Sequence, residues 1–232
     1  MGLAGLIALP LLDSGVGSTL VAPAAAKGAP AGKRAVSSPS LDALDDALLA
    51  DRLAAVGERT KDALLLIAAA KIKQRIGESE ATRKPASKRS DAAAPKRKGD
   101  ARRTDVGSLL ARAKHYAGGR KDLIALADDV ANTRSRGRVG GVSRTEHVIR
   151  GRTEFMTSHT FQGGSAAGVA IRGDGDTDLD LFVLDASGRP LCGADGPTDE
   201  EICRWRPAGT SEFTIVIRNL GGVSNAYRLW TN

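Results

Sequence analysis

Aspartates recur at every second position in one short stretch of the C-terminal half, at Asp174, Asp176, Asp178 and Asp180. Four carboxylates this close repel one another unless a cation or solvent screens their charges. Surroundings rich in oxygen ligands and free of thiols and imidazoles favour a hard cation. Because Mg²⁺ demands rigid octahedral geometry, Ca²⁺ suits a loop better. The stretch therefore predicts a calcium site.

A second acidic loop follows at residues 195–199. The first loop is not an EF-hand, since Leu179 and Asp185 stand where that motif requires Gly and prefers Glu. A calcium roll is excluded because its nonapeptide would have to recur. The alternative is an exposed hairpin whose aspartates serve turn geometry and solubility. The predicted metal ligands are Asp174, Asp176, Asp178, Asp180, Asp195 and Asp199.

The two cysteines of the chain, Cys192 and Cys203, flank the second acidic loop. In an oxidising compartment they would form a disulfide that stabilises the fold by about 2–3 kcal/mol and holds the two acidic loops together. A zinc site needs about four ligands, and no CxxC motif or histidine cluster accompanies the pair. Reduced cytosolic thiols are the remaining alternative.

The N-terminus favours the oxidising compartment. The apolar run at residues 2–12 is too short to span a bilayer, and Ala24 and Ala26 form an A-x-A cleavage pattern before Lys27. Residues 1–26 are therefore predicted to be a signal peptide, with the basic residues that usually precede the apolar run encoded upstream of Met1. We expect a periplasmic or secreted protein with no stable membrane span after signal removal; an Ala-rich disordered tail is the alternative.

No constellation of residues predicts catalysis. The histidines, His115, His147 and His159, lack zinc-ligand spacing, and no GxSxG elbow presents a serine. The carboxylates crowd one loop instead of flanking a cleft as in glycosidases. Phosphate-binding and dinucleotide-binding motifs are absent from the sequence. We expect no catalytic or cofactor-binding residues and no enzymatic activity.

Two segments carry apolar residues at helical spacing. Residues 40–77 predict a helical hairpin, with Ser40 as the first cap, Gly57 as the end of the first helix and Gly77 as the end of the second. Residues 104–133 predict a second helical pair. Stripes of Leu and Ala of this kind usually serve packing.

Between and before these helices the composition predicts disorder. Residues 27–39 read as a disordered spacer. Residues 78–103 hardly contain a large apolar side chain, and within them residues 81–103 carry nine Lys and Arg against two Asp, an excess that equals the net charge of +7. The alternative to a solvated linker is contact with a polyanion. Because no aromatic residue interrupts the charges, nucleic acid is not expected as a partner.

From about residue 145 the hydrophobic period changes from 3.6 to 2. Eight short strands alternate with turn signals, which is typical of a β-sandwich or barrel. Connections this short exclude parallel crossovers. The predicted strands are HVIR, EFMTSHTF, AAGVAIRG, DLDLFVLD, RPLC, EICRW, EFTIVIRN and YRLWTN.

These strands also carry a resemblance. The runs GDGDTDLDLFVLD, TDEEICRWRP and GTSEFTIVIRNLGGVSNAYRLWTN resemble the bacterial pre-peptidase C-terminal (PPC) domain across residues 145–232. The resemblance implies a jelly-roll-like β-sandwich, and hence an α+β fold with a segregated helical region. It further implies binding, export or stabilising roles, calcium in some members and no chemistry. No peptidase domain precedes the sandwich, which departs from the usual arrangement.

Together these observations predict an exported, non-catalytic binding or accessory protein with a calcium-stabilised sandwich. The expected partner is an envelope protein or a polysaccharide. One alternative is a polyanion-binding envelope protein that acts through the basic linker. The other is an accessory subunit of a secreted peptidase.

Overall fold

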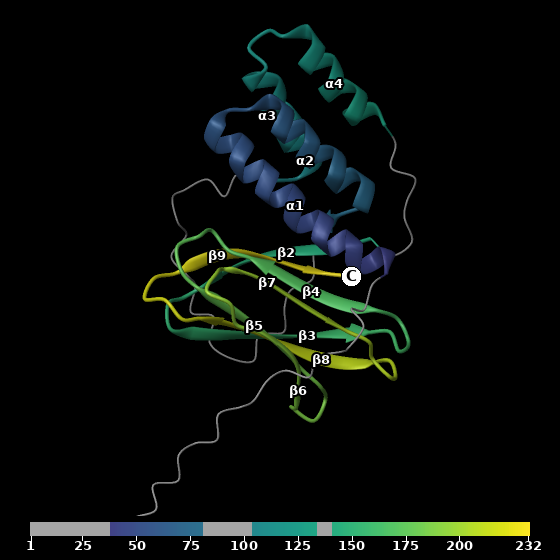
Figure 1. The fold of residues 1–232 in the computed structure, drawn as a ribbon, viewed down its shortest axis with the longest axis vertical. Coiled ribbons are helices and arrows are strands. Elements are labelled where there is room, and N and C mark those ends of the chain that lie inside the picture. Colours follow the sequence, from purple (N-terminus) through teal and green to yellow (C-terminus); the bar gives the residue numbers. More distant parts are fainter. Residues whose placement is uncertain (1–37, 81–103, 134–140) are drawn as a thin grey trace, which may run out of the picture. The chain divides into compact units, whose positions relative to one another are not determined.

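The computed structural model describes residues 38–80, 104–133 and 141–232. The predicted signal peptide, nearly all of the predicted spacer and most of the basic linker lie outside these residues. Four helices precede the main body of strands, and Figure 1 shows their arrangement. The helices are α1 (Pro39–Thr60), α2 (Ala63–Ile76), α3 (Val106–Tyr116) and α4 (Lys121–Asn132). The strands are β1 (Ser79–Glu80), β2 (Ser143–Ile149), β3 (Thr153–Phe161), β4 (Ala167–Arg172), β5 (Leu179–Leu184), β6 (Pro190–Ala194), β7 (Glu200–Trp205), β8 (Ser211–Asn219) and β9 (Asn225–Thr231).

The strands form a two-layered sandwich. One sheet has the order β1-β2-β9-β4-β7 and the other β3-β8-β5-β6. All pairs are antiparallel except the short β1–β2 pair. Without β1, these are the two four-stranded sheets of a jelly roll. The predicted α+β class and all eight predicted strands are confirmed, whereas the sequence did not indicate β1.

Alternation along the strands builds the core between the sheets. On β5, Leu179, Leu181 and Val183 are fully buried, while the residues between them face outward. They pack with inward-facing residues of β8, such as Ile215 and Ile217. The period of two therefore reports one buried face per strand.

The first helix is longer than predicted. Its cap is Ser38, whose hydroxyl accepts a hydrogen bond from Leu41, and not Ser40. Gly57 does not end the helix, because α1 continues to Thr60 and Lys61 takes the left-handed conformation. Gly57 instead lies buried where α1 meets α2, and a Cβ there would come within 2.9 Å of the Leu66 side chain. Its missing side chain permits close helix packing.

The remaining helix boundaries follow the sequence signals closely. Asp62 caps α2, and Gly77 ends it with φ of 64°, as predicted. The last helix ends at Asn132. Apolar stripes of all four helices share a core that includes Ala54, Leu66 and Leu109, which confirms their packing role.

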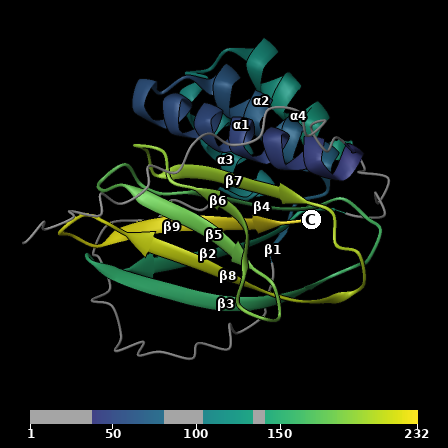
Figure 2. The same cartoon turned by 60° about the horizontal axis from the view of Figure 1, so that its bottom comes forward.

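The helical layer packs on the five-stranded sheet. Leu41 and Leu44 of α1 share a buried cluster with Ala170 on β4 and Trp230 on β9. Figures 1 and 2 both show the helices beside this sheet. Because no described helix lies on the other side, the outer face of β3-β8-β5-β6 is left without a helical cover.

Buried charges reinforce the same contact. Asp51 of α1 is 1% exposed. Its carboxylate forms ion pairs with the guanidinium groups of Arg172 on β4, at 2.5 Å, and Arg228 on β9, at 2.9 Å. Charge that is buried in this way requires partners. These pairs therefore fix how α1 sits on the sheet.

The start of the predicted disordered linker is ordered, which corrects that prediction for residues 78–80. The Glu78 side chain is 6% exposed and lies 2.9 Å from the Lys73 ammonium and 3.2 Å from the Arg144 guanidinium. The indole of Trp230 donates to the same carboxylate at 3.3 Å. The composition of residues 78–103 predicted that Glu78 would be solvated. Two of the partners that bury it, Arg144 and Trp230, come from distant parts of the chain.

Candidate functional site

Four loops meet at one end of the sandwich, which we call the acidic end. Strand pairing places them together, since Arg172 at the end of β4 pairs with Glu200 at the start of β7. The backbone N–H of Gly173 donates to the carbonyl of Asp199 at 2.8 Å, which joins the two predicted acidic loops. The loops comprise residues 150–152, 173–178, 195–199 and 220–224.

Two of the six predicted ligands stabilise these loops. Asp174 accepts hydrogen bonds from the backbone N–H groups of Asp176 at 3.3 Å and Ala226 at 3.1 Å. Asp199 accepts from the N–H of Gly175 at 2.5 Å. The contact with Asp176 is a turn contact that short acidic side chains commonly make, whereas the other two join separate parts of the chain. Asp176 itself is exposed.

The other three predicted ligands lie near enough to Glu201 for their charges to raise its pKa. Asp180 is only 6% exposed, and burial followed by the charges of Asp178 and Asp195 raises its pKa, although Arg218 acts in the opposite direction. One carboxylate oxygen of Asp178 is buried with no hydrogen-bond partner within the described residues. This group of four, Asp178, Asp180, Asp195 and Glu201, is called the carboxylate cluster below.

Glu201 is the member that sequence reasoning missed. Burial raises its pKa most, the N–H of Gly196 lowers it, and the charges of Asp178, Asp180 and Asp195 raise it further. Glu201 stands two residues before the core residue Cys203 on β7, so strand alternation puts it on the inward side. That spacing was the signal in the sequence.

The cluster has the oxygen-rich chemistry that hard cations prefer, but its side chains are not arranged as a coordination site. Among the described residues, no three Asp, Glu, His or Cys side chains are arranged to hold a metal ion. Arg218 is shared, because its Nε also donates to Glu154 at 2.5 Å and its guanidinium lies 4.7 Å from the Phe182 ring centre. The cluster therefore combines an Asp178 oxygen without a hydrogen-bond partner in the described residues with a buried Asp180 carboxyl group.

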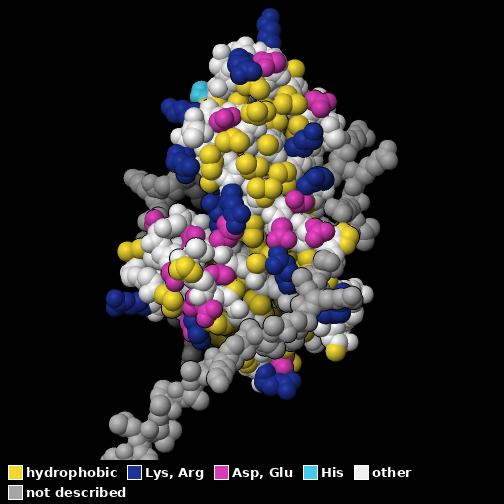
Figure 3. Space-filling view, viewed as in Figure 1, with side chains coloured by type: hydrophobic (Ala, Val, Ile, Leu, Met, Phe, Trp, Pro, Cys, Tyr) yellow, Lys and Arg dark blue, Asp and Glu magenta, His cyan; other side chains and the backbone are white. Residues whose placement is uncertain are grey.

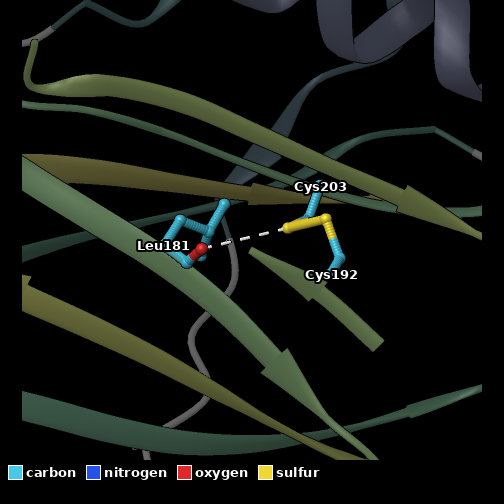
Figure 4. Close-up of a disulfide and its surroundings, with 3 residues drawn as sticks. All are labelled: Leu181, Cys192 and Cys203. Atoms are coloured by element: carbon cyan, nitrogen blue, oxygen red, sulfur yellow. Dashed lines mark hydrogen bonds between the residues drawn. A yellow bond between two sulfur atoms is a disulfide. The ribbon is translucent and has the colours of Figure 1, made fainter. Parts of the chain in front are cut away.

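The predicted disulfide is present beside the cluster. Cys192 of β6 is bonded to Cys203 of β7 with a Cα–Cα distance of 5.8 Å. Figure 4 shows the bridge and the 4.0 Å contact from the Cys203 sulfur to the Leu181 carbonyl oxygen. Because β6 and β7 belong to different sheets, the bridge ties the two layers at the base of the 195–199 loop.

The histidines lie in separate places. His147 stacks on Tyr227 with ring centres 5.3 Å apart, and its Nε2 hydrogen-bonds Thr145 at 2.9 Å. His159 lies beside Phe161 on β3, and His115 lies on α3. In the described residues, no helix is both long and apolar enough to cross a membrane.

Comparison with known proteins gives a limited result. No family model matches the chain, and no curated protein matches it either. Among solved structures, a mitogen from Yersinia pseudotuberculosis is 16% identical, covers 40% of this chain and 85% of its own, and has a TM-score of 0.34. The pre-peptidase C-terminal domain of a Bacillus anthracis collagenase is 10% identical over 38% of this chain and 87% of its own, with a TM-score of 0.32.

A carbohydrate-binding module of the Cellvibrio mixtus lichenase 5A, solved with cellotriose, is 12% identical over 36% of this chain and 72% of its own, with a TM-score of 0.26. At such identities and scores, these similarities go no further than a general relationship to β-sandwich proteins. Membership of the PPC family stays a prediction.

Proposed function

We propose that this protein is an exported, non-catalytic binding protein whose β-sandwich is stabilised by Ca²⁺ at the acidic end. The observation that supports the proposal is the carboxylate cluster, in which partly or fully buried carboxyl groups raise one another's pKa values, and Arg218 opposes this effect at Asp180. Asp178, Asp180, Asp195 and Glu201 would supply the oxygen ligands. Bound Ca²⁺ would supply positive charge that offsets their repulsion and tightens the loops.

Thermal unfolding of the full chain with EDTA and with added Ca²⁺ tests this proposal. A ligand that binds the folded state at about a hundred times its Kd should raise Tm by roughly 5–10 °C for a chain of this size. The double variant Asp178→Asn/Asp180→Asn should lose that rise. In EDTA it should melt no lower than the wild type, because the substitution also relieves repulsion.

The matched control is Asp176→Asn, which alters an exposed aspartate of the same loop outside the cluster. It should keep the full calcium response. A response in the double variant equal to that of the wild type would remove the site assignment. Loss of the response in Asp176→Asn alone would favour the ligand set predicted from the sequence over the cluster.

For the binding partner we propose a polysaccharide of the cell envelope that contacts the open face of β3-β8-β5-β6. This face presents the half-buried Phe182 next to Arg218, with Met156 and Leu191 exposed at 38% and 47%. Ligand sites commonly combine apolar surface with a few polar groups in this way. Affinity electrophoresis in envelope polysaccharide should show retardation that Phe182→Ala weakens.

Binding through the basic linker is the competing function, supported by the charge of residues 81–103. It predicts affinity that falls steeply with salt and disappears when the linker is deleted. Retardation that survives this deletion but not Phe182→Ala would exclude it.

A further inference from the structure

A hollow in the helical layer lies apart from the acidic end. It has a volume of about 440 Å³ and lies between α2 and the end of α4. This volume falls within the range of pockets that hold small molecules. The residues that line it are Ala68, Lys71, Ile72, Gln74, Arg75 and Thr133. Figure 3 shows hydrophobic side chains gathered over this layer, with Lys and Arg side chains around them.

The floor of the hollow is apolar. Ala68 and Ile72 lie one helical turn apart on α2 and are both only half-buried, so their side chains reach solvent. The aliphatic stems of the neighbouring Lys and Arg side chains extend this surface. An exposed apolar hollow of this kind gains stability when an apolar group fills it.

The rim of the hollow carries positive charge. Helix α2 contains three cations and no acidic residue. Lys73 is buried against Glu78, and Arg75 pairs with Asp46 at 2.9 Å. Lys71 is exposed and has no ion-pair partner among the described residues.

Carbonyl groups at the end of α4 would disfavour an anion, because a helix C-terminus carries partial negative charge. The side-chain amide of Gln74 occupies them, since it donates to the carbonyls of Val130, at 3.1 Å, and Thr133. The charge that a ligand meets at this rim is therefore set mainly by Lys71.

We propose that this hollow binds a small amphiphilic anion, with its alkyl chain against Ala68 and Ile72 and its carboxylate at Lys71. The positive charge of Lys71 favours an anionic head group, and the apolar floor favours an alkyl chain. The site does not depend on calcium or on the sandwich face described above.

Decanoate serves as the probe, in calorimetric titrations of the full chain at low salt. The wild type should bind decanoate saturably and bind decyltrimethylammonium more weakly, since only the head-group charge differs. Lys71→Gln should weaken decanoate binding by roughly fivefold, as expected for a partly exposed ion pair. Ala68→Phe should abolish binding by filling the hollow.

Two control variants separate the site from general effects. Lys121→Gln removes another exposed lysine, and Ala55→Phe adds the same ring to an exposed position of α1. Both should bind decanoate as the wild type does. Absence of saturable binding to the wild type, or unchanged binding in Lys71→Gln, would overturn the proposal, even if Ala68→Phe failed to fold.

Discussion

Ionisation of individual carboxyl groups changes the stability of this protein in opposite directions. Asp180 and Glu201 have raised pKa values because burial and neighbouring carboxylates disfavour their charged forms. Asp185, in the exposed turn after β5, has a lowered pKa because the Ser187 hydroxyl and then the Arg189 backbone N–H donate to it. The first two oppose folding when ionised, whereas Asp185 favours folding when ionised.

The sign of this linkage gives a residue-scale prediction. A raised pKa in the folded state means that the stabilising contribution is present below the unfolded pKa, near pH 4, and is lost as pH rises through the folded value. Without calcium, Asp180→Asn/Glu201→Gln should therefore gain stability relative to the wild type as pH rises from about 4 to about 7. Denaturant unfolding at several pH values measures this difference. A difference that does not change with pH would contradict the repulsion described here.

Asp185→Asn provides the opposite sign as a control. Its lowered pKa means that stability is present above the unfolded pKa and is lost as pH falls. The variant should be destabilised at neutral pH and approach the wild type in acid.

At the scale of elements, strands β6 and β7 show how a local sequence pattern and the disulfide act together. The β6–β7 connection crosses from one sheet to the other, and the disulfide joins the two strands near the carboxylate cluster. The alternation of both strands was visible in the sequence, and the two cysteines could pair only with each other inside one chain. β6 and β7 are edge strands of different sheets and do not pair with each other. The disulfide links them in place of backbone hydrogen bonds.

The disulfide gives a prediction at this scale. Cys192→Ser should lower the free energy of unfolding by about 2–3 kcal/mol under oxidising conditions, because the unfolded chain loses a constraint. With reductant present, the variant and the wild type should have equal stability. Chemical denaturation in both conditions is the measurement, and an equal loss with reductant present would show that the thiol acts through packing alone.

At the scale of the whole described fold, buried charges join the helices to the sandwich. The Glu78 carboxylate forms ion pairs with Lys73 of α2 and Arg144 of β2, and it accepts a hydrogen bond from Trp230 of β9. Breaking a buried ion pair leaves a charge without its partner, which costs more than the pair contributes. The helical layer and the sandwich should therefore unfold in one transition.

Glu78→Gln tests this coupling. It leaves the buried Lys73 without a carboxylate and leaves Arg144 with Glu146 as its remaining acidic partner, and should destabilise the protein by about 3 kcal/mol or more. Helix content by circular dichroism and tryptophan fluorescence should both shift to lower denaturant, with coincident midpoints. Asp122→Asn, which breaks the exposed pair with Arg120, should leave the denaturation midpoint nearly unchanged. Separate transitions for the two signals would contradict the coupling.

The sequence by itself determined the elements, because hydrophobic period, caps and turn residues are local properties. It predicted every strand from β2 to β9, the ends of α2 and α4, and the disulfide. It did not reveal that Gly57 permits helix contact, since a glycine in the sequence signals a turn as readily as a close approach.

Only the tertiary structure decided which charges meet. Asp174 and Asp199 accept hydrogen bonds that join separate loops, whereas Asp178 and Asp180 lie at the same end as Glu201. Strand alternation tells which face a side chain occupies, but the order of strands in the two sheets decides which loops become neighbours. That order results from pairing between residues far apart in the chain, which no local pattern encodes.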